Sequence, residues 1–202
     1  MATRGPRGDV TAAGILRAAD RLLAERGRVE GISLRGIAAE VGVAVNALYT
    51  YFASLDAIWH DLADERLGLL RPTELLGRPC AHCALLELAD RAMTVLSTPG
   101  TVSLLRRGPV LGPRSFALSE TIMTLTERAH LDPRDAHDLV VGWFYGSSVL
   151  DGEGWTSGTD AIRDREPLRD FPRIAGRSTP DRKQQAEAIL RGIGLSSSAT
   201  RT

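Results

Sequence analysis

Apolar side chains recur at intervals of three and four residues along most of this chain, the spacing that places them on one face of a helix. From Thr11 the apolar positions run through 15, 18, 19, 22 and 23. Gly27 follows where a helix commonly ends, and Ser33 precedes the next apolar run where a hydroxyl commonly caps a helix. The pattern therefore predicts one helix from Thr11 to Gly27 and a second from Ser33 to Val41.

The helical spacing continues beyond Gly42, where we expect a sharp turn. A third helix is predicted over about residues 44–52, and a fourth over about 54–70. Farther on, prolines and glycines separate longer apolar runs, which predict helices over residues 80–97, 100–107, 114–130, 133–150 and 181–193. Residues 151–180 show no sustained period, and we expect a long loop there.

Composition agrees with a helical protein. The 202 residues are 43 % apolar and 25 % charged, an ordinary globular mixture, and runs rich in Val, Ile and Thr, typical of strands, are nearly absent. We therefore expect an all-α fold, in which a small N-terminal domain precedes a larger helical domain. We expect a flexible arm over residues 1–10 and the first domain over residues 11–55. The second domain is expected over residues 56–195, and a disordered tail over residues 196–202.

The net charge and the length of the apolar runs indicate where the protein resides and what it can bind. The formal net charge is +0, and residues 1–60 carry seven Arg against six acidic residues. The chain therefore has no large excess of positive charge that would by itself indicate nucleic-acid binding. The first ten residues lack the apolar core of a signal peptide. The longest apolar stretch, residues 139–150, is interrupted by glycine and serine and is shorter than the roughly 18–20 residues of a membrane span. We expect a soluble, cytoplasmic protein with no membrane partner.

Residues 33–52 meet the demands of a helix-turn-helix motif, whose second helix can lie in the major groove. A small apolar inner face lets two short helices cross closely, and Gly42 permits the turn between them. The outward face offers groups to phosphates and base edges, namely Ser33, Arg35, Val45, Asn46, Tyr49, Thr50 and Tyr51. By spacing alone, plain packing of two helices around a glycine is an equally good interpretation.

The order of residues in this stretch is more specific than its spacing. It reads SLRGIA over 33–38, VGV over 41–43 and LYTYF over 48–52, after LLAERG over 22–27. Over about residues 13–60, without a gap, the chain resembles the DNA-binding domain of the tetracycline-repressor family. The resemblance implies a DNA-binding transcriptional regulator, a homodimeric repressor of a palindromic operator that a small-molecule ligand releases.

The resemblance also implies roles for individual residues. Ser33 and Tyr49 would bind phosphates, and Arg35 would take both acceptors of a guanine. Val45 would touch a thymine methyl, and Asn46 would read adenine or meet the DNA backbone. The full set expected to contact double-stranded DNA is Ser33, Arg35, Ala44, Val45, Asn46, Tyr49, Thr50 and Tyr51.

Three positions depart from the family pattern. Tyr51 stands where the family often has a histidine, with the same phosphate-binding task. Ala44 stands where Ser or Thr is usual, so the recognition helix lacks its cap. Leu55 stands where a Lys is common, which removes one phosphate contact per subunit and about one charge from the salt dependence. Arg4 and Arg7 in the arm either compensate by reaching the DNA or only keep the arm solvated.

The resemblance implies an N-terminal three-helix helix-turn-helix domain and a larger helical domain, which binds a small-molecule effector and forms the homodimer. The helices near 133–150 and 181–193 are expected at the dimer interface, because Gly142 and Gly146 leave a smooth strip for another helix. Packing within one subunit is the alternative. Expected ligand-binding residues, each of which could instead be ordinary core, are Met93, Phe116, Met123, Trp143, Phe144 and Tyr145.

The remaining candidate chemistry lies at Cys80, His82 and Cys83. Such a C-x-x-C pair could hold zinc or cycle as a dithiol, or simply be two small residues near a helix start. No second Cys or His pair lies nearby, so we expect no metal and no cofactor. No catalytic or nucleotide-binding motif is evident, which predicts that the chain is no enzyme. A regulator that acts by protein contact stays open because of Leu55.

Overall fold

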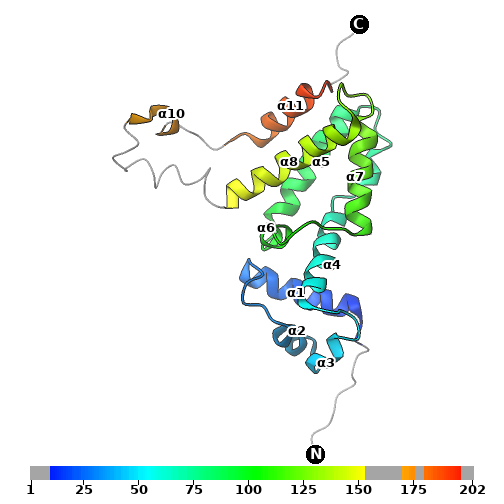
Figure 1. The fold of residues 1–202 in the computed structure, drawn as a ribbon, viewed down its shortest axis with the longest axis vertical. Helices are drawn as coiled ribbons and strands as arrows, with labels where there is room; N and C mark the ends of the chain where they lie inside the picture. The colour runs from blue at the N-terminus through cyan, green and yellow to red at the C-terminus, as the bar shows by residue number, and fades with distance from the viewer. Residues whose placement is uncertain (1–9, 153–169, 176–179, 197–202) are drawn as a thin grey trace, which may run out of the picture. The chain divides into compact units, whose positions relative to one another are not determined.

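The computed structural model describes residues 10–152, 170–175 and 180–196 (Figure 1). All regular secondary structure in these ranges is helical, which confirms the predicted all-α fold. Contacts divide the chain into two compact units, Met1–Leu69 with Val95–Phe116 and Leu70–Thr94 with Ala117–Thr202. In the described part of the chain, no helix combines the length and the apolar character that a membrane crossing requires.

The first unit holds the N-terminal helices and a short later one: α1 (Ala12–Arg26), α2 (Leu34–Val41), α3 (Val45–Leu48), α4 (Leu55–Gly68) and α6 (Thr101–Leu105). The cap predicted at Ser33 is confirmed, and Ser54 caps α4 in the same way. The Ser33 hydroxyl accepts the Gly36 N–H at 3.2 Å, and the Ser54 hydroxyl accepts the Ala57 N–H at 3.1 Å. Gly27 ends α1 with a φ of 68°, a conformation that costs glycine little.

Helices α1, α2 and α4 share one core. Helix α1 packs against both α2 and α4, α2 packs against α3, and α4 packs against α6. The side chains that this core buries completely are Ile15, Leu23, Ile37, Leu48 and Ile58. Each contributes about 1.5–3 kcal/mol relative to an exposed position, so α2 and α3 are held in a fixed mutual orientation.

The second unit contains most of the later helices: η1 (Pro72–Leu75), α5 (Ala81–Ser97) up to Thr94, α7 (Pro113–Thr126) from Ala117, α8 (Pro133–Gly152), α10 (Pro172–Ala175) and α11 (Arg182–Gly192). Helix α11 packs against α8. The chain after α11 is tied down by a backbone hydrogen bond from the N–H of His130 to the carbonyl of Ile193, at 2.8 Å.

The predicted loop over 151–180 is wrong at the ends that the structure describes. Helix α8 continues to Gly152, and α10 covers Pro172–Ala175. A helix can begin at Pro172 because the first helical N–H has no partner to lose. The predictions about the arm, with Arg4 and Arg7, and about the tail fall almost wholly outside the described residues and stay predictions.

Candidate nucleic-acid interface

The turn between α2 and α3 depends on Gly42. Its φ is 80°, in the left-handed region where a side chain costs about 1–2 kcal/mol. The Gly42 N–H donates to the Ala39 carbonyl at 3.1 Å, and the Val43 N–H donates to the Ala38 carbonyl at 2.9 Å. The turn is therefore hydrogen-bonded on both sides of the glycine, as the sequence predicted.

The second helix of the motif is shorter than predicted. Helix α3 spans only Val45–Leu48, and Ala44 precedes it without a side-chain cap. Hydrogen bonds from the Tyr51 and Phe52 N–H groups to the Leu48 carbonyl, at 2.9 and 3.0 Å, continue the chain as turns. Phe52, where the predicted helix ended, is buried, with the residue 5 % exposed.

Most residues predicted to contact DNA lie on the solvent-facing side of this motif. Arg35, Asn46 and Thr50 are exposed, and Tyr49 is 53 % exposed. Ala44 is also exposed, whereas Val45 is half-buried. Among the described residues, the Arg35 guanidinium has no hydrogen bond or ion pair. Its donors are therefore available to an outside acceptor.

Two predicted phosphate ligands already make hydrogen bonds. The Ser33 oxygen accepts the Gly36 N–H, which leaves its own proton free to donate. The Tyr51 hydroxyl donates its single proton to the Val10 carbonyl at 2.5 Å. Tyr51 thus fastens the start of α1 to the end of the motif, and a phosphate contact would require its hydroxyl to exchange partners.

A buried arginine on α4 joins this helix to α1 and α6. The Arg66 side chain is 5 % exposed and meets Asp20 of α1, with Nη2 and Oδ1 2.6 Å apart. Its Nη1 also donates to the Pro99 carbonyl at 3.0 Å and to the hydroxyl of Thr101. One guanidinium therefore connects α1, α4 and the beginning of α6.

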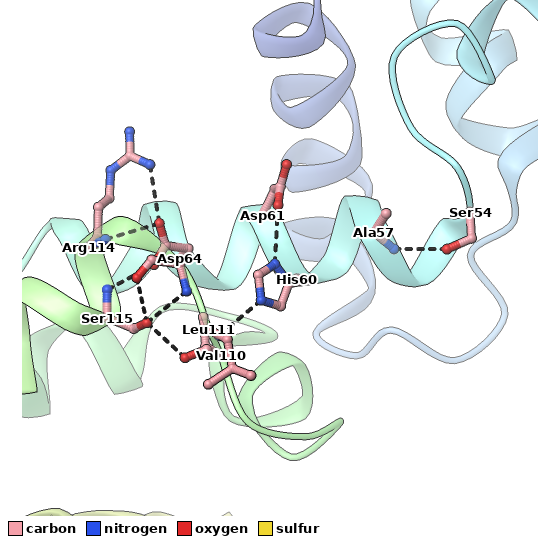
Figure 2. A network of polar contacts seen from close by, with 10 residues as sticks. Ser54, Ala57, His60, Asp61, Asp64, Val110, Leu111, Arg114 and Ser115 are labelled. Atoms are coloured by element: carbon pink, nitrogen blue, oxygen red, sulfur yellow. Dashed lines mark hydrogen bonds and ion pairs between the residues drawn. The ribbon is translucent and has the colours of Figure 1, made fainter.

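A second polar network lies nearer the middle of α4. Figure 2 shows Asp64 pointing from α4 toward Arg114 and Ser115, at the beginning of α7. Its carboxylate, 4 % exposed, accepts the N–H of Ser115 at 2.8 Å and that of Arg114 at 3.3 Å. Asp64 thus caps α7 from another helix, where a negative charge suits the helix N-terminus.

The segment before α7 is attached to α4 at a further point. The His60 Nε2 accepts the Leu111 N–H at 2.9 Å, and its Nδ1 lies 3.1 Å from a carboxylate oxygen of Asp61 (Figure 2). Because Nε2 accepts, the proton of a neutral ring resides on Nδ1. Gly112 stands so close to Asp64 that an added Cβ would lie 2.3 Å from the Asp64 Cγ.

A cavity of about 790 Å³ lies in the second unit, among α5, α8 and α11. Two of the six predicted ligand-binding residues, Met93 and Trp143, line it. The other four do not: Phe116, Met123, Phe144 and Tyr145. Phe144 instead meets the Trp143 ring edge to face, with centroids 5.0 Å apart, and Phe116 is 55 % exposed.

Residues 15–62 match the family model described as bacterial regulatory proteins, tetR family. This N-terminal domain is that of the tetR family of bacterial regulatory proteins. The matched residues are the helix-turn-helix and the first half of α4, so the exposed face of α2 and α3 belongs to the DNA-binding domain of a transcriptional regulator. The family and the fold are those of regulators rather than of an enzyme class.

Solved structures of tetR-family proteins share this fold. One is a possible tetR-family transcriptional regulator from Streptomyces coelicolor A3(2), with a TM-score of 0.71 and 19 % identity over 91 % of this chain and 96 % of that one. ActR of Streptomyces coelicolor, in complex with actinorhodin, has a TM-score of 0.75 and 16 % identity over 92 % of this chain and 97 % of that one. TetR from Acinetobacter baumannii has a TM-score of 0.67 and 20 % identity over 91 % of this chain and 96 % of that one. No curated protein matches the sequence.

The sequence interpretation overlooked the polar residues on α4. Arg66 had a usable signal, because it follows Ile58 and Leu62 at steps of four and so falls on the buried face of the helix. A charged residue in that phase indicates a buried partner. Asp64 gave no such signal, since its burial depends on a segment about fifty residues farther along the chain.

Proposed function

We propose that this chain is a homodimeric repressor that acts in the cytoplasm, binds a palindromic operator and is released by a small-molecule effector. It has no catalytic role in this proposal. The observation that carries DNA binding is the exposed face of α2 and α3, where the unpaired Arg35 stands among exposed polar side chains. Because few charges face outward, we propose that two subunits together supply the affinity.

DNA binding is tested by exchanging one charge. The wild type and Arg35→Glu are compared by fluorescence anisotropy on a palindromic site selected from a random duplex library, at fixed salt. Loss of a contact worth about 1–3 kcal/mol in each subunit predicts affinity weaker by about 30-fold or more. The matched control is Arg28→Glu, which makes the same charge change at another exposed position. Arg28 lies outside the α2–α3 motif, next to Val29, whose N–H donates to Ser103 of α6.

Each outcome of this comparison is informative. Weak binding by Arg35→Glu with full binding by Arg28→Glu supports the proposed interface. Equal loss in both variants indicates a general charge effect and contradicts a role for Arg35. If the wild type selects no duplex, the chain is no DNA-binding repressor, and a regulator that acts through protein contacts becomes the better description.

Helix α8 supports the proposed dimer. Gly142 and Gly146 are exposed, and a Cβ added at either position meets nothing within 4 Å. Leu139 and Tyr145 on the same helix are 48 % and 38 % exposed. A smooth strip flanked by exposed apolar side chains is the kind of surface that a second copy covers in a two-fold helical bundle.

The dimer is tested with Gly146→Arg, which the isolated subunit accommodates because the surrounding space is open. We expect a dimer for the wild type and a folded monomer for the variant, by sedimentation equilibrium and circular dichroism. Thr124→Arg adds the same group at an exposed position of α7 and serves as the control. A wild-type monomer, or a variant that dimerises as well as the control, contradicts an α8 interface.

We further propose that the effector enters the cavity among α5, α8 and α11, because its wall combines apolar and charged groups. Actinorhodin, which ActR holds in its crystal structure, is one test compound. Binding should quench the fluorescence of Trp143 on the cavity wall, and Trp143→Phe should lose that signal while Trp59, 2 % exposed in the first unit, still reports the fold. Quenching that persists in Trp143→Phe contradicts this location.

Release requires a connection between the ligand site and α2–α3. Within the first unit, α4 supplies two connections: Arg66 joins it to α1 and α6, and Asp64 joins it to the beginning of α7. We propose that a shift of α6 or α7 reaches the recognition helix through these bonds, with a coupling free energy of about 1–3 kcal/mol.

A further inference from the structure

Cys80 and Cys83 lie at the beginning of α5, outside the DNA-binding face. The structure joins them as a disulfide, with their Cα atoms 5.2 Å apart, inside the range that a disulfide spans without moving the backbone. Cys83 is exposed and Cys80 is half-buried. Small molecules in solution therefore reach the pair.

The backbone around Cys80 favours its thiolate. Its carbonyl accepts the Ala84 N–H at 2.9 Å, the first bond of α5, and its sulfur accepts the Cys83 N–H at 3.2 Å. Cys80 thus caps a 17-residue helix. Negative charge on a sulfur at this place is stabilised by the donated N–H and by the partial positive charge of the helix N-terminus.

His82 supplies an independent observation at the same place. Its side chain is buried, with the residue 9 % exposed, and its Nδ1 has no hydrogen-bond partner among the described residues. One of its ring nitrogens and the two sulfurs all lie within 4.8 Å of one another. An unpartnered buried nitrogen is costly, and the ring that carries it lies beside both sulfurs.

We propose that Cys80 and Cys83 are a reversible redox pair that exchanges two electrons with low-molecular-weight disulfides, with Cys80 as the attacking thiolate and His82 as the base for Cys83. The inference concerns the thiols alone and does not rest on DNA binding. A structural disulfide is the other interpretation of a bonded pair, and it predicts no exchange.

The exchange balances in two steps. The Cys80 thiolate, its proton lost to solvent, attacks one sulfur of a disulfide RSSR; that S–S bond breaks, and RS⁻ leaves as the Cys80–SR bond forms. Cys83 then gives its proton to His82 and attacks the Cys80 sulfur, which expels the second RS⁻. Both thiolates take up a proton from water or His82, so two protein thiols are oxidised to one disulfide while RSSR is reduced to two RSH.

The test uses the full chain, reduced and then placed in buffers of oxidised and reduced glutathione. Mass spectrometry after rapid alkylation counts the free thiols. We expect the wild type to pass reversibly from two free thiols to none. Cys83→Ser should accumulate a glutathione adduct on Cys80, whereas Cys80→Ser should react at least about tenfold more slowly because its remaining thiol lacks the helix cap. Serine at position 80 still caps α5, so this variant keeps its fold.

His82→Gln tests the base and provides a readout that loss of packing would not give. We expect closure of the disulfide to slow by about tenfold or more near neutral pH, and to recover at a pH of about 9, where thiols ionise without help. A variant that is equally slow at both values contradicts the role of His82.

Three results overturn the redox pair. In the first, the disulfide stays intact in reduced glutathione. In the second, the reduced thiols stay free in oxidised glutathione. Alternatively, native mass spectrometry of the reduced chain could show one zinc ion that blocks both thiols until a chelator removes it, which would assign the cluster to metal binding.

Discussion

The ion pair between Asp20 and Arg66 should stabilise the first unit far more than its neighbour on α1 does. Asp20 meets a guanidinium that is 5 % exposed, whereas Arg21 meets Glu40, whose side chain is 36 % exposed. The nitrogen–oxygen distances are similar, 2.6 and 2.8 Å. The two pairs start from consecutive residues of one helix and differ mainly in how much water surrounds the partner.

The magnitude follows from these contacts. Two nitrogens of Arg66, Nε at 3.2 Å and Nη2 at 2.6 Å, donate to the same Asp20 oxygen, and a hydrogen bond to a charged group contributes about 1.5–3 kcal/mol. Because Asp20 is 47 % exposed, solvent screens part of the attraction between Asp20 and Arg66. We therefore expect a coupling energy of about 2 kcal/mol. The exposed Arg21–Glu40 pair should give about 0.2–1 kcal/mol.

Two double-mutant cycles measure this difference. The first combines Asp20→Ala with Arg66→Met, and the second combines Arg21→Ala with Glu40→Ala. Urea unfolding is followed by circular dichroism at one fixed protein concentration, because dimerisation would otherwise shift the apparent stability. Coupling energies that agree within about 0.5 kcal/mol would show that the burial of Arg66 does not strengthen its ion pair, and would refute the reasoning.

Three further predictions concern the turn, the cap of α7 and a surface carboxylate. Gly42→Ala should lower the free energy of unfolding by about 1–2 kcal/mol, measured by urea unfolding, because its φ is 80°. Gly112→Ala should lower it by about 1–3 kcal/mol in the same assay, because the new Cβ would strike Asp64. Hydrogen bonding from Arg91 lowers the pKa of Glu87; Arg91→Gln should raise that pKa toward its ordinary value in a carbon-13 NMR titration.

The sign of the Glu87 effect follows from linkage. A carboxyl whose pKa is lower in the folded state stabilises that state above its unfolded pKa, and the contribution disappears as the pH falls through the folded pKa. The difference in unfolding free energy between Arg91→Gln and wild type should therefore narrow under acid conditions, to the part that comes from the Arg91 bonds to the Leu70 and Arg71 carbonyls. A gap that widens as the pH falls would contradict an ion-pair origin.

Two glycines provide controls for the glycine substitutions. Gly36 lies inside α2, where an added Cβ would be 3.7 Å from the Ser33 hydroxyl, and Gly142 lies in α8 with open space around it. Alanine at either position should leave the subunit as stable or raise its stability by up to about 1 kcal/mol. Destabilisation of Gly36→Ala as large as that of Gly42→Ala would remove the left-handed turn as the explanation.

The polar contacts of α4 bear on how a regulator of this fold could transmit a signal. Hydrogen bonds are short-range and directional, so a small displacement of Thr101 or Ser115 relative to α4 breaks bonds rather than stretching them. Because Arg66 and Asp64 are buried, each broken bond leaves an unsatisfied group that costs about 1–3 kcal/mol. That cost is similar in size to the coupling free energies of allosteric proteins.

Much of the DNA-binding domain could be predicted from the sequence because its determinants are local. Ser33 caps α2 through Gly36, three residues away, and Gly42 turns the chain within one residue. Apolar periodicity marks the buried faces of α1 and α2 in the same way. The exposed position of Arg35 follows directly, since it lies away from the buried face of α2.

Other features were decided only by the tertiary structure, because their partners are far away in the chain. Tyr51 donates to Val10 across 41 positions, and Asp64 caps α7 across 51. The cavity needs α5, α8 and α11 at once, and of the six residues predicted to bind a ligand only Met93 and Trp143 line it. Caps and periods depend on residues three or four apart, whereas burial of a charge and the walls of a cavity depend on which segments meet, and no local pattern records that.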